Sequence, residues 1–474
     1  MFLLRLFYGK RKGKITMKLI FDVADKPKAG QLVVFALQQM LAILAATIAV
    51  PAIVQNGLTP AAAMFGAGVG TLVYILFTKK KSPVFLGSSF AFINSMFAAF
   101  AGATSMQLGM LGLIIGAVFA GLVYVIIAII VKFVGVGWIN KLMPAVVIGP
   151  TVAIIGLSLA GNAAGDLLKS DVGGEGAEYA ALICGLVTLA VTMLCSTYGK
   201  KMTRLIPFIL GILAGYVVAA GCTIIGNAAD IPALQIIDFS VFENYMFTDG
   251  AVSLSTFFSI PDFTFVEALG GFGELDGSYI ATIFVAYVPV AFVVFAEHIA
   301  DHKNLSSVIG HDLLEEPGLS RTLLGDGVGS MVGAFFGGCP NTTYGESVGC
   351  VAITRNASVV SIIAAAVGCI LFSFITPLIA FIDSIPACVM GGVCMALYGF
   401  IAVSGLKMLQ TVDLNKNRNL FVASVILIAG IGGLSVSFGA VTLTPIAMAL
   451  ILGILANVML SKEKDEPESD EKHE

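Results

Sequence analysis

The chain of 474 residues contains few charged residues. Asp, Glu, Lys and Arg together make up 12% of it, whereas 58% of the residues are hydrophobic. An average soluble domain is roughly 25% charged, so these few charges cannot cover a surface that faces water. Because apolar runs of about 20 residues recur along the chain, we expect most of it to lie in the hydrocarbon core of a bilayer.

The residues that catalysis and metal binding usually require are also scarce. The chain has four histidines and eight cysteines, no two of the cysteines form a CxxC pair, and no HExxH motif occurs. We therefore interpret the cysteines as small packing residues, and we expect no enzyme activity, no metal and no cofactor. The formal net charge of -4 provides no basic surface, so nucleic acid is not expected as a partner.

Both ends of the chain are predicted to be cytoplasmic. Residues 1–30 form an N-terminal segment without a long apolar region or a small-residue cleavage site, so we predict no cleaved signal sequence. Residues 461–474 carry mostly charged side chains and are predicted to be a disordered cytoplasmic tail.

The apolar runs predict about fourteen transmembrane segments in two sets of seven. The first set lies within residues 31–225 and the second within 279–460. Residues 226–278 separate the two sets and contain eight acidic residues but no Lys or Arg. Short cytoplasmic loops are rich in Lys and Arg, so this stretch is predicted to be an extracytoplasmic loop. The resulting protein is a multi-pass protein of the cell (inner or cytoplasmic) membrane.

Seven segments per set would make the two halves inverted repeats, an architecture of many secondary transporters. Two of the shortest runs, residues 85–100 and 341–354, are third in their sets and rich in Gly and Ser. Such segments predict interrupted backbone at membrane depth, which is tolerated only where protein or a cavity surrounds it. A matching pair of interrupted segments is the best sequence indication of a transporter's substrate site.

Few ionisable residues lie within the apolar segments, and each of them costs free energy there. Glu297 and Asp301 are four residues apart, on one face of a helix, and Glu346 lies in the second short run. Glu297, Asp301 and His302 are also compatible with a helix end at the inner interface. His298 lies off the Glu297 face and is better explained as a structural hydrogen-bonding group.

Two carboxylates that face a dry cavity repel anions and favour a ligand with N–H donors. Burial and mutual repulsion favour their protonated forms, which is what proton-coupled transport requires. Carboxylates that accept hydrogen bonds, combined with backbone N–H groups that donate them, complement the imide edge of uracil or of a purine dione.

Several motifs together resemble one family. They are GGCPNTTYGESVGCVAITR at residues 337–355, AEH at 296–298, DLLEEPGLSR at 312–321, GSSFAF at 87–92 and IPACVMGGVCMALYG at 385–399. In this order and spacing they resemble the uracil permease branch of the nucleobase/ascorbate transporters, also called nucleobase-cation symport family 2. The resemblance extends from about residue 31 to residue 460.

The resemblance implies an all-α fold of fourteen segments in two inverted repeats, with segments 3 and 10 short and broken. It also implies two domains. The core domain would comprise residues 31–134 (segments 1–4) and 279–379 (segments 8–11), and the gate domain residues 143–225 (segments 5–7) and 385–460 (segments 12–14).

The resemblance also implies the substrate-binding residues. Glu297 and Glu346 would bind the N–H groups of the base, and the backbone at Phe90 and Gly345 would meet its carbonyl oxygens. Tyr344 would line the pocket, although Phe90 and Tyr344 are equally typical of ordinary aromatic packing. Glu346 is the form that resembles uracil carriers, because purine carriers tend to have Gln at this position.

Proton coupling is assigned to Glu297, Asp301 and Glu346. Asp301 departs from the family, which usually has a histidine one helical turn after the first glutamate. This extra carboxylate is compatible with a proton relay, and sodium remains an alternative coupling ion.

The sequence therefore predicts an importer of uracil that works by proton symport, surrounded by lipid and assembled as a homodimer. One alternative is a xanthine or urate permease of the same family. Another is an anion exchanger of the same architecture, but such a protein should present a basic residue to its ligand, where this chain has Glu346.

Overall fold

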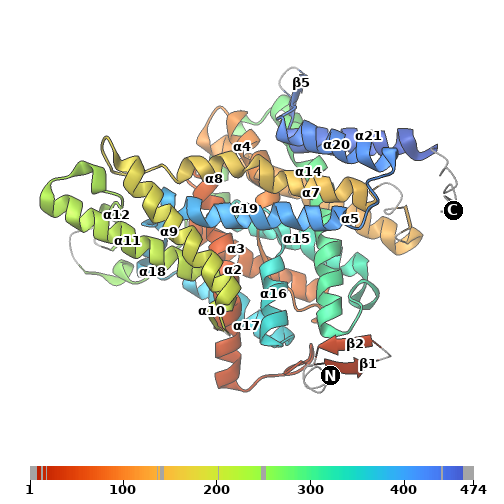
Figure 1. Ribbon diagram of the computed structural model, residues 1–474, viewed down its shortest axis with the longest axis horizontal. Coiled ribbons are helices and arrows are strands. Elements are labelled where there is room, and N and C mark those ends of the chain that lie inside the picture. Colours follow the sequence, from red (N-terminus) through yellow and green to blue (C-terminus); the bar gives the residue numbers. More distant parts are fainter. Residues whose placement is uncertain are drawn as a thin grey trace, which may run out of the picture.

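The computed structural model describes residues 8–11, 14–17, 19–135, 137–138, 143–200, 202–246, 252–438 and 441–462. The described chain is mostly helical, as predicted (Figure 1). Most of the predicted C-terminal tail, from residue 463 onward, lies outside the described residues, as do parts of the N-terminal segment and residues 247–251 of the predicted outer loop.

Eight helices of the described residues are long and apolar enough to cross a membrane. They are α2 (Ala29–Val54), α3 (Pro60–Phe77), α5 (Met106–Val134), α7 with α8 (Ala145–Ser158 and Ala160–Asp166), α9 (Ala177–Tyr198), α11 (Pro207–Ala229), α14 (Gly277–Ile309) and α19 (Ala387–Leu409). Four more apolar helices are shorter: Phe90–Ala101, α17 (Val359–Phe372), α20 (Asn417–Ile431) and α21 (Pro445–Met459). The chain is a multi-pass membrane protein, whereas the count of fourteen segments stays a prediction.

Other elements are the strands β1 (Tyr8–Arg11), β2 (Lys14–Met17), β5 (Val436–Phe438) and β6 (Val441–Leu443), the short helices α10 (Met202–Leu205), α12 (Ser240–Met246), α13 (Thr264–Ala268) and α18 (Thr376–Asp383), and the 19-residue helix α15 (Leu319–Gly337). β1 pairs with β2, and β5 with β6, each as an antiparallel hairpin.

One group of helices packs around α15, which contacts α3 and α5 extensively, while α17 packs on α2 and α3. Glycine allows the close approach of α3 and α15. A Cβ atom on Gly66 would lie 2.4 Å from the carbonyl oxygen of Gly333, and one on Gly70 would lie 2.7 Å from that of Gly329. In lipid, burial of apolar surface does not favour helix–helix contacts over helix–lipid contacts. Close packing between helices favours association instead, and small residues at the crossing permit it.

A second group packs around α19, which contacts α7, α8 and α9, while α20 packs on α7 and α21. Glycines again lie at the crossings: a Cβ atom on Gly156 would lie 2.2 Å from the carbonyl oxygen of Tyr398, and one on Gly405 would lie 2.4 Å from that of Gly149. The helices of the first group come from the residues assigned to the core domain, and those of the second group from the residues assigned to the gate domain.

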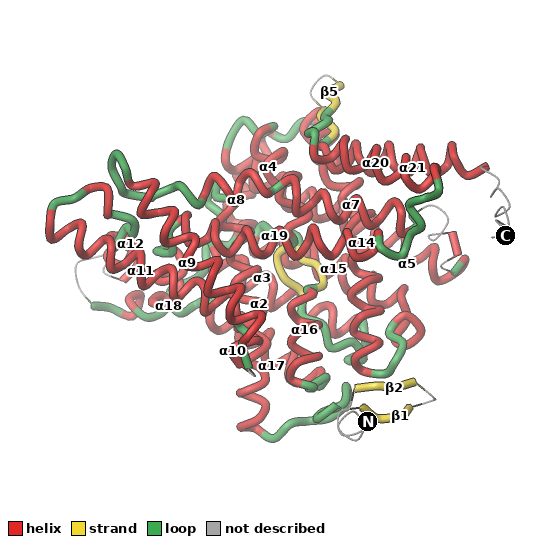
Figure 2. Tube along the Cα trace, viewed as in Figure 1, coloured by secondary structure: helices red, strands yellow, loops and turns green. Residues whose placement is uncertain are grey.

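Two strands lie in the middle of the helices, drawn in yellow in Figure 2. β3 (Leu86–Ser88) precedes the 3₁₀ turn Phe90–Phe92 and α4 (Ile93–Ala101), and β4 (Asn341–Thr343) precedes α16 (Gly345–Thr354). The strands pair antiparallel, with Gly87 opposite Thr342. The two short runs of the sequence therefore each consist of a strand followed by a short helix, and they pair with each other.

The acidic stretch between the two halves is folded against the rest of the chain. The backbone N–H of Ser259 donates to the carbonyl of Phe374, and that of Thr376 donates to the carbonyl of Phe257, both at 3.0 Å. α12 packs on α18, and the Tyr245 hydroxyl donates a hydrogen bond to Asp383. This connection between α11 and α14 is thereby fastened to the connection between α17 and α19.

Residues 20–25 also have a defined place. The backbone N–H of Ile20 donates to the carbonyl of Arg355 at 2.8 Å, and that of Ala357 donates to the carbonyl of Phe21 at 2.9 Å. The Ser358 hydroxyl donates to the carbonyl of Asp25 at 2.6 Å. The N-terminal segment thus runs along the connection between α16 and α17.

The α3–α15 crossing leads to a prediction on stability. Gly66→Ala would place a methyl group against backbone atoms of α15, which cannot move away as the end of a side chain can. We expect a loss of about 1–3 kcal/mol of unfolding free energy, seen as a lower midpoint of thermal unfolding in detergent. The matched control is Gly399→Ala on α19, where no atom lies within 4 Å; an equal change in both variants would contradict the prediction.

Candidate substrate site

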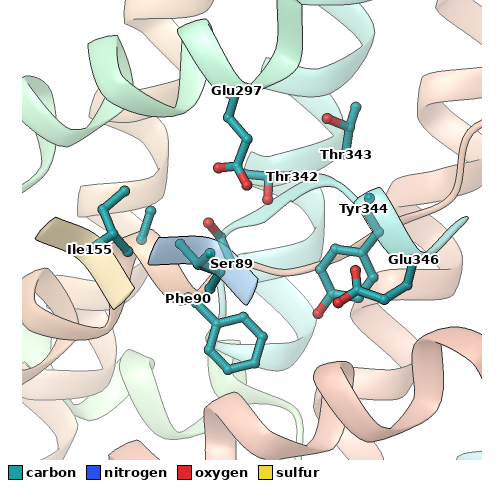
Figure 3. A pocket seen from close by; sticks show the side chains of 11 residues that line it. Ser89, Phe90, Ile155, Glu297, Thr342, Thr343, Tyr344 and Glu346 are labelled. Carbon is teal, nitrogen blue, oxygen red and sulfur yellow. The ribbon is translucent and has the colours of Figure 1, made fainter. Parts of the chain in front are cut away.

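A pocket lies where the paired strands meet α14 (Figure 3). The empty space around it, about 330 Å³, includes open solvent at the mouth of the pocket. The pocket is lined by Ser89, Phe90, Ala91, Ile155, Glu297, Thr342, Thr343, Tyr344, Gly345, Glu346 and Ile401. All five residues predicted to bind substrate are therefore in one place, although they come from three distant parts of the chain.

Two carboxylates point into this space from different elements. Glu297 extends from α14, well inside that helix, which continues to Ile309, and Glu346 lies in the first turn of α16 (Figure 3). The structure thus gives no support to a helix end at Glu297. Among the described lining residues there is no Lys, Arg or His, so neither carboxylate has a basic partner in the pocket.

Two helices begin at the pocket. α16 starts at Gly345, and the short helical stretch that leads into α4 starts at Phe90; both residues line the pocket. The first N–H groups of a helix have no partner within it and carry partial positive charge. The pocket therefore combines carboxylate acceptors with backbone donors.

Tyr344 is held in place by the opposite strand. Its hydroxyl donates a 2.7 Å hydrogen bond to the carbonyl of Ser88, and its ring covers Gly87, where a Cβ atom would lie 2.4 Å from the ring. Phe90 packs edge-on against Tyr398 of α19, with ring centroids 5.9 Å apart. Both aromatic side chains therefore line the pocket and pack at the same time.

Asp301 is buried behind the pocket lining. It accepts a 2.9 Å hydrogen bond from the Thr343 hydroxyl, and Thr343 is itself a lining residue. Asp301 and Glu297 therefore differ in position: Glu297 faces the pocket, whereas Asp301 reaches it through the hydroxyl of Thr343.

The two histidines of α14 belong to a buried polar network next to the site. His298 Nδ1 lies 2.6 Å from an Asp326 oxygen, and His298 Nε2 lies 3.0 Å from the Thr322 hydroxyl. His302 Nε2 lies 2.7 Å from the Tyr74 hydroxyl. His298 thus has the predicted structural hydrogen bonds, and His302 is buried rather than at an interface.

Several residues of this region were not predicted from the sequence. Asp326 was not singled out, although a lone Asp in an apolar run is itself a signal. Ser89 and Thr342 flank the predicted residues in sequence. Ile155 and Ile401 gave no signal, because isoleucine in an apolar helix is typical of packing and lipid contact.

The second short segment also contains one GxSxG pattern, Gly345–Gly349, which in hydrolases marks a nucleophilic serine. Here the Ser347 hydroxyl accepts hydrogen bonds from Gln39 Nε2 at 2.5 Å and from the Phe85 N–H at 3.0 Å. Neither partner is a base, so the geometry gives Ser347 the role of tying α2 and β3 to α16.

The comparisons with known proteins identify the family of the chain. The model of the Permease family (Xan_ur_permease) matches residues 30–439. The uracil permease of Bacillus caldolyticus is 41% identical, with 94% of this chain and 95% of the relative covered. The uracil permeases of Bacillus subtilis strain 168 and Escherichia coli K12 are 37% and 35% identical, covering 96% and 91% of this chain and 99% and 92% of the relatives.

Solved structures show the fold. The transmembrane domain of the cyanobacterial bicarbonate transporter BicA aligns with a TM-score of 0.60 at 15% identity, covering 91% of this chain and 97% of that one. The murine anion transporter Slc26a9 in the inward-facing state aligns with a TM-score of 0.59 at 13% identity, covering 92% and 69%. At these identities the likeness concerns the fold alone.

The family model spans most of the chain, and the curated relatives exceed 30% identity over nearly their whole length. The chain is a transporter, not an enzyme, and it belongs to the Permease family of nucleobase/ascorbate transporters.

Proposed function

We propose that the chain imports uracil by proton symport. The observation that carries the proposal is the pair of carboxylates, Glu297 and Glu346, in one small pocket that also receives the first N–H groups of two helices. Uracil has two N–H donors and two carbonyl acceptors, so it uses both kinds of group. Three relatives named uracil permease, covered over nearly their full length, support this substrate.

In the proposed complex, Glu297 and Glu346 accept hydrogen bonds from the N–H groups of the base. The backbone N–H groups of Phe90 and Gly345 donate to its carbonyl oxygens, and Tyr344 provides an apolar wall. Every polar group is then paired, which matters because an unpaired buried polar group costs about 1–3 kcal/mol.

Proton coupling is assigned to Glu297, Glu346 and Asp301. A carboxylate that is partly shielded from water carries its charge at a free-energy cost, so uptake of a proton and uptake of the neutral base favour each other. Asp301 contacts the pocket through Thr343, a position suited to relay a proton without touching the base. Sodium coupling is the alternative that the experiment below distinguishes.

Transport is proposed to alternate access by movement of the core domain (31–134 and 279–379) against the gate domain (143–225 and 385–460). The two packing groups of helices and the lining of the pocket support this division, because Glu297, Phe90 and Glu346 belong to one group and Ile155 and Ile401 to the other. Four further points stay predictions: the number of segments, the cytoplasmic termini, the location in the cell membrane and the homodimer in lipid.

Two other substrates are the competing proposals. The fold also occurs in transporters of bicarbonate and other anions, but two carboxylates without a basic lining residue among the described ones disfavour an anion. A xanthine or urate permease shares the imide chemistry of uracil and differs in ring size, so competition by xanthine separates it from a uracil carrier.

The first prediction concerns coupling. In sodium-free proteoliposomes under an inward proton gradient, we expect accumulation of labelled uracil that is insensitive to excess xanthine. Glu346→Gln should lower it at least about tenfold, because the amide cannot take up the coupled proton and loses a hydrogen bond to a charged group, which is worth about 1.5–3 kcal/mol. Glu315→Gln, an exposed carboxylate outside the pocket, should leave uptake unchanged. If uptake strictly requires sodium, the assignment of the proton as the coupling ion is wrong. If xanthine competes fully, the assignment of uracil as the specific substrate is wrong.

The second prediction concerns Asp301. Thr343→Val removes the hydroxyl group that donates a hydrogen bond to Asp301. The shape of the Thr343 side chain is retained. We expect uracil binding to purified protein within about threefold of wild type, but gradient-driven uptake reduced at least about fivefold, as expected for one lost hydrogen bond to a charged group. Thr343→Ser restores the hydroxyl and should restore uptake; equal losses of binding and uptake would assign Thr343 to the binding site instead.

A further inference from the structure

The pocket lining is divided by chemistry and by origin. Every polar lining side chain comes from α14 or from the two paired segments, β3 with the turn after it and β4 with α16. The lining residues of α7 and α19 are Ile155 and Ile401, both apolar. Ile155 lies on the opposite side of the pocket from Glu346 (Figure 3), and its side chain is 1% exposed.

The uracil ring is likewise divided into a polar part and an apolar part. Its polar atoms N1, O2, N3 and O4 belong to consecutive ring positions, whereas carbons 5 and 6 carry only C–H groups. If the polar positions pair with Glu297, Glu346 and the N–H groups of Phe90 and Gly345, the C5–C6 edge faces away from them, toward the side of the pocket where Ile155 lies (Figure 3). Ile401, on the helix that packs on α7, also lines the pocket.

We infer that Ile155 and Ile401 determine substrate specificity by excluding bases that are enlarged at the C5–C6 edge of the pyrimidine ring. This inference rests on the proposed function and deepens it. Thymine carries a methyl group on C5, and a purine such as xanthine carries its second ring on the same edge. Both keep the imide edge that pairs with the carboxylates, so they differ from uracil at the edge that we place against Ile155 and Ile401.

Steric exclusion of this kind has a known magnitude. One methyl or methylene group in an apolar pocket discriminates between substrates by roughly 10–200-fold. Because Ile155 is fully buried, its side chain has no open space to move into. A methyl group on C5 must therefore displace either Ile155 or the base.

The experiment measures inhibition of labelled uracil uptake by thymine and by xanthine in proteoliposomes. For each variant, the readout is the inhibition constant of the competitor divided by that of unlabelled uracil. Ile155→Ala and Ile401→Ala each remove three carbon atoms from the wall, and we expect the thymine ratio to fall at least about tenfold. Ile155→Val and Ile401→Val should shift it less and in the same direction, which covers the case of a poorly folded Ala variant.

The matched control is Ile154→Ala. Ile154 neighbours Ile155 on α7 and is equally buried, but it packs against Gly430 instead of lining the pocket. An unchanged ratio in Ile154→Ala together with a reduced ratio in the Ile155 and Ile401 variants supports the inference. Equal shifts in all three, no shift in any, or strong inhibition of the wild type by thymine would overturn it.

Two methylated bases test the orientation itself. 1-Methyluracil and 3-methyluracil lose an N–H group on the carboxylate side, so no change at the isoleucines should admit them; inhibition by them in Ile155→Ala would overturn the orientation. Failure of the proposed function and failure of the specificity inference give different results. A wild type that does not take up uracil refutes the proposed function, whereas uracil uptake with unaltered ratios refutes only the specificity wall.

Discussion

Every backbone N–H and C=O group at membrane depth needs a partner, and the two short strands depend on this constraint. β3 and β4 pair with each other, with Gly87 opposite Thr342, and beyond the strands the N–H of Tyr344 donates to the carbonyl of Phe85 and that of Ser89 to the carbonyl of Pro340. The Thr71 hydroxyl both accepts from the N–H of Leu86 and donates to its carbonyl. Because the strands pair, both following helices can begin at the middle of the molecule, and their free N–H groups become available to a ligand.

Glycine makes this centre possible. The α3–α15 crossing brings two backbones into contact at Gly66 and Gly333, and the Asn341 side chain, at the start of β4, donates to the carbonyl of Gly66. Gly87 leaves room for the Tyr344 ring across the strand pair. A methyl group at either Gly66 or Gly87 would therefore alter the pocket as well as the packing, so stability and substrate recognition share the same residues.

Much of this could be predicted from the sequence, for identifiable reasons. Glu297 and Glu346 stand out because a charge in an apolar run is costly, and the two short runs stand out because their Gly and Ser content breaks the helical pattern. Pairing of β3 with β4 could not be read from strands of three residues. Nor could Ile155 and Ile401, because an isoleucine that faces a pocket and one that faces lipid have the same sequence context.

The position of Asp301 could also be predicted from the sequence only in part. Spacing placed it on the Glu297 face, and the structure keeps it on that side of α14 but covers it with Thr343. A helix face is wide enough to hold one carboxylate in the pocket and the next one turn behind it. In the proposed mechanism, Asp301 exchanges a proton with the pocket lining through Thr343 and does not contact the base, whereas Glu297 does.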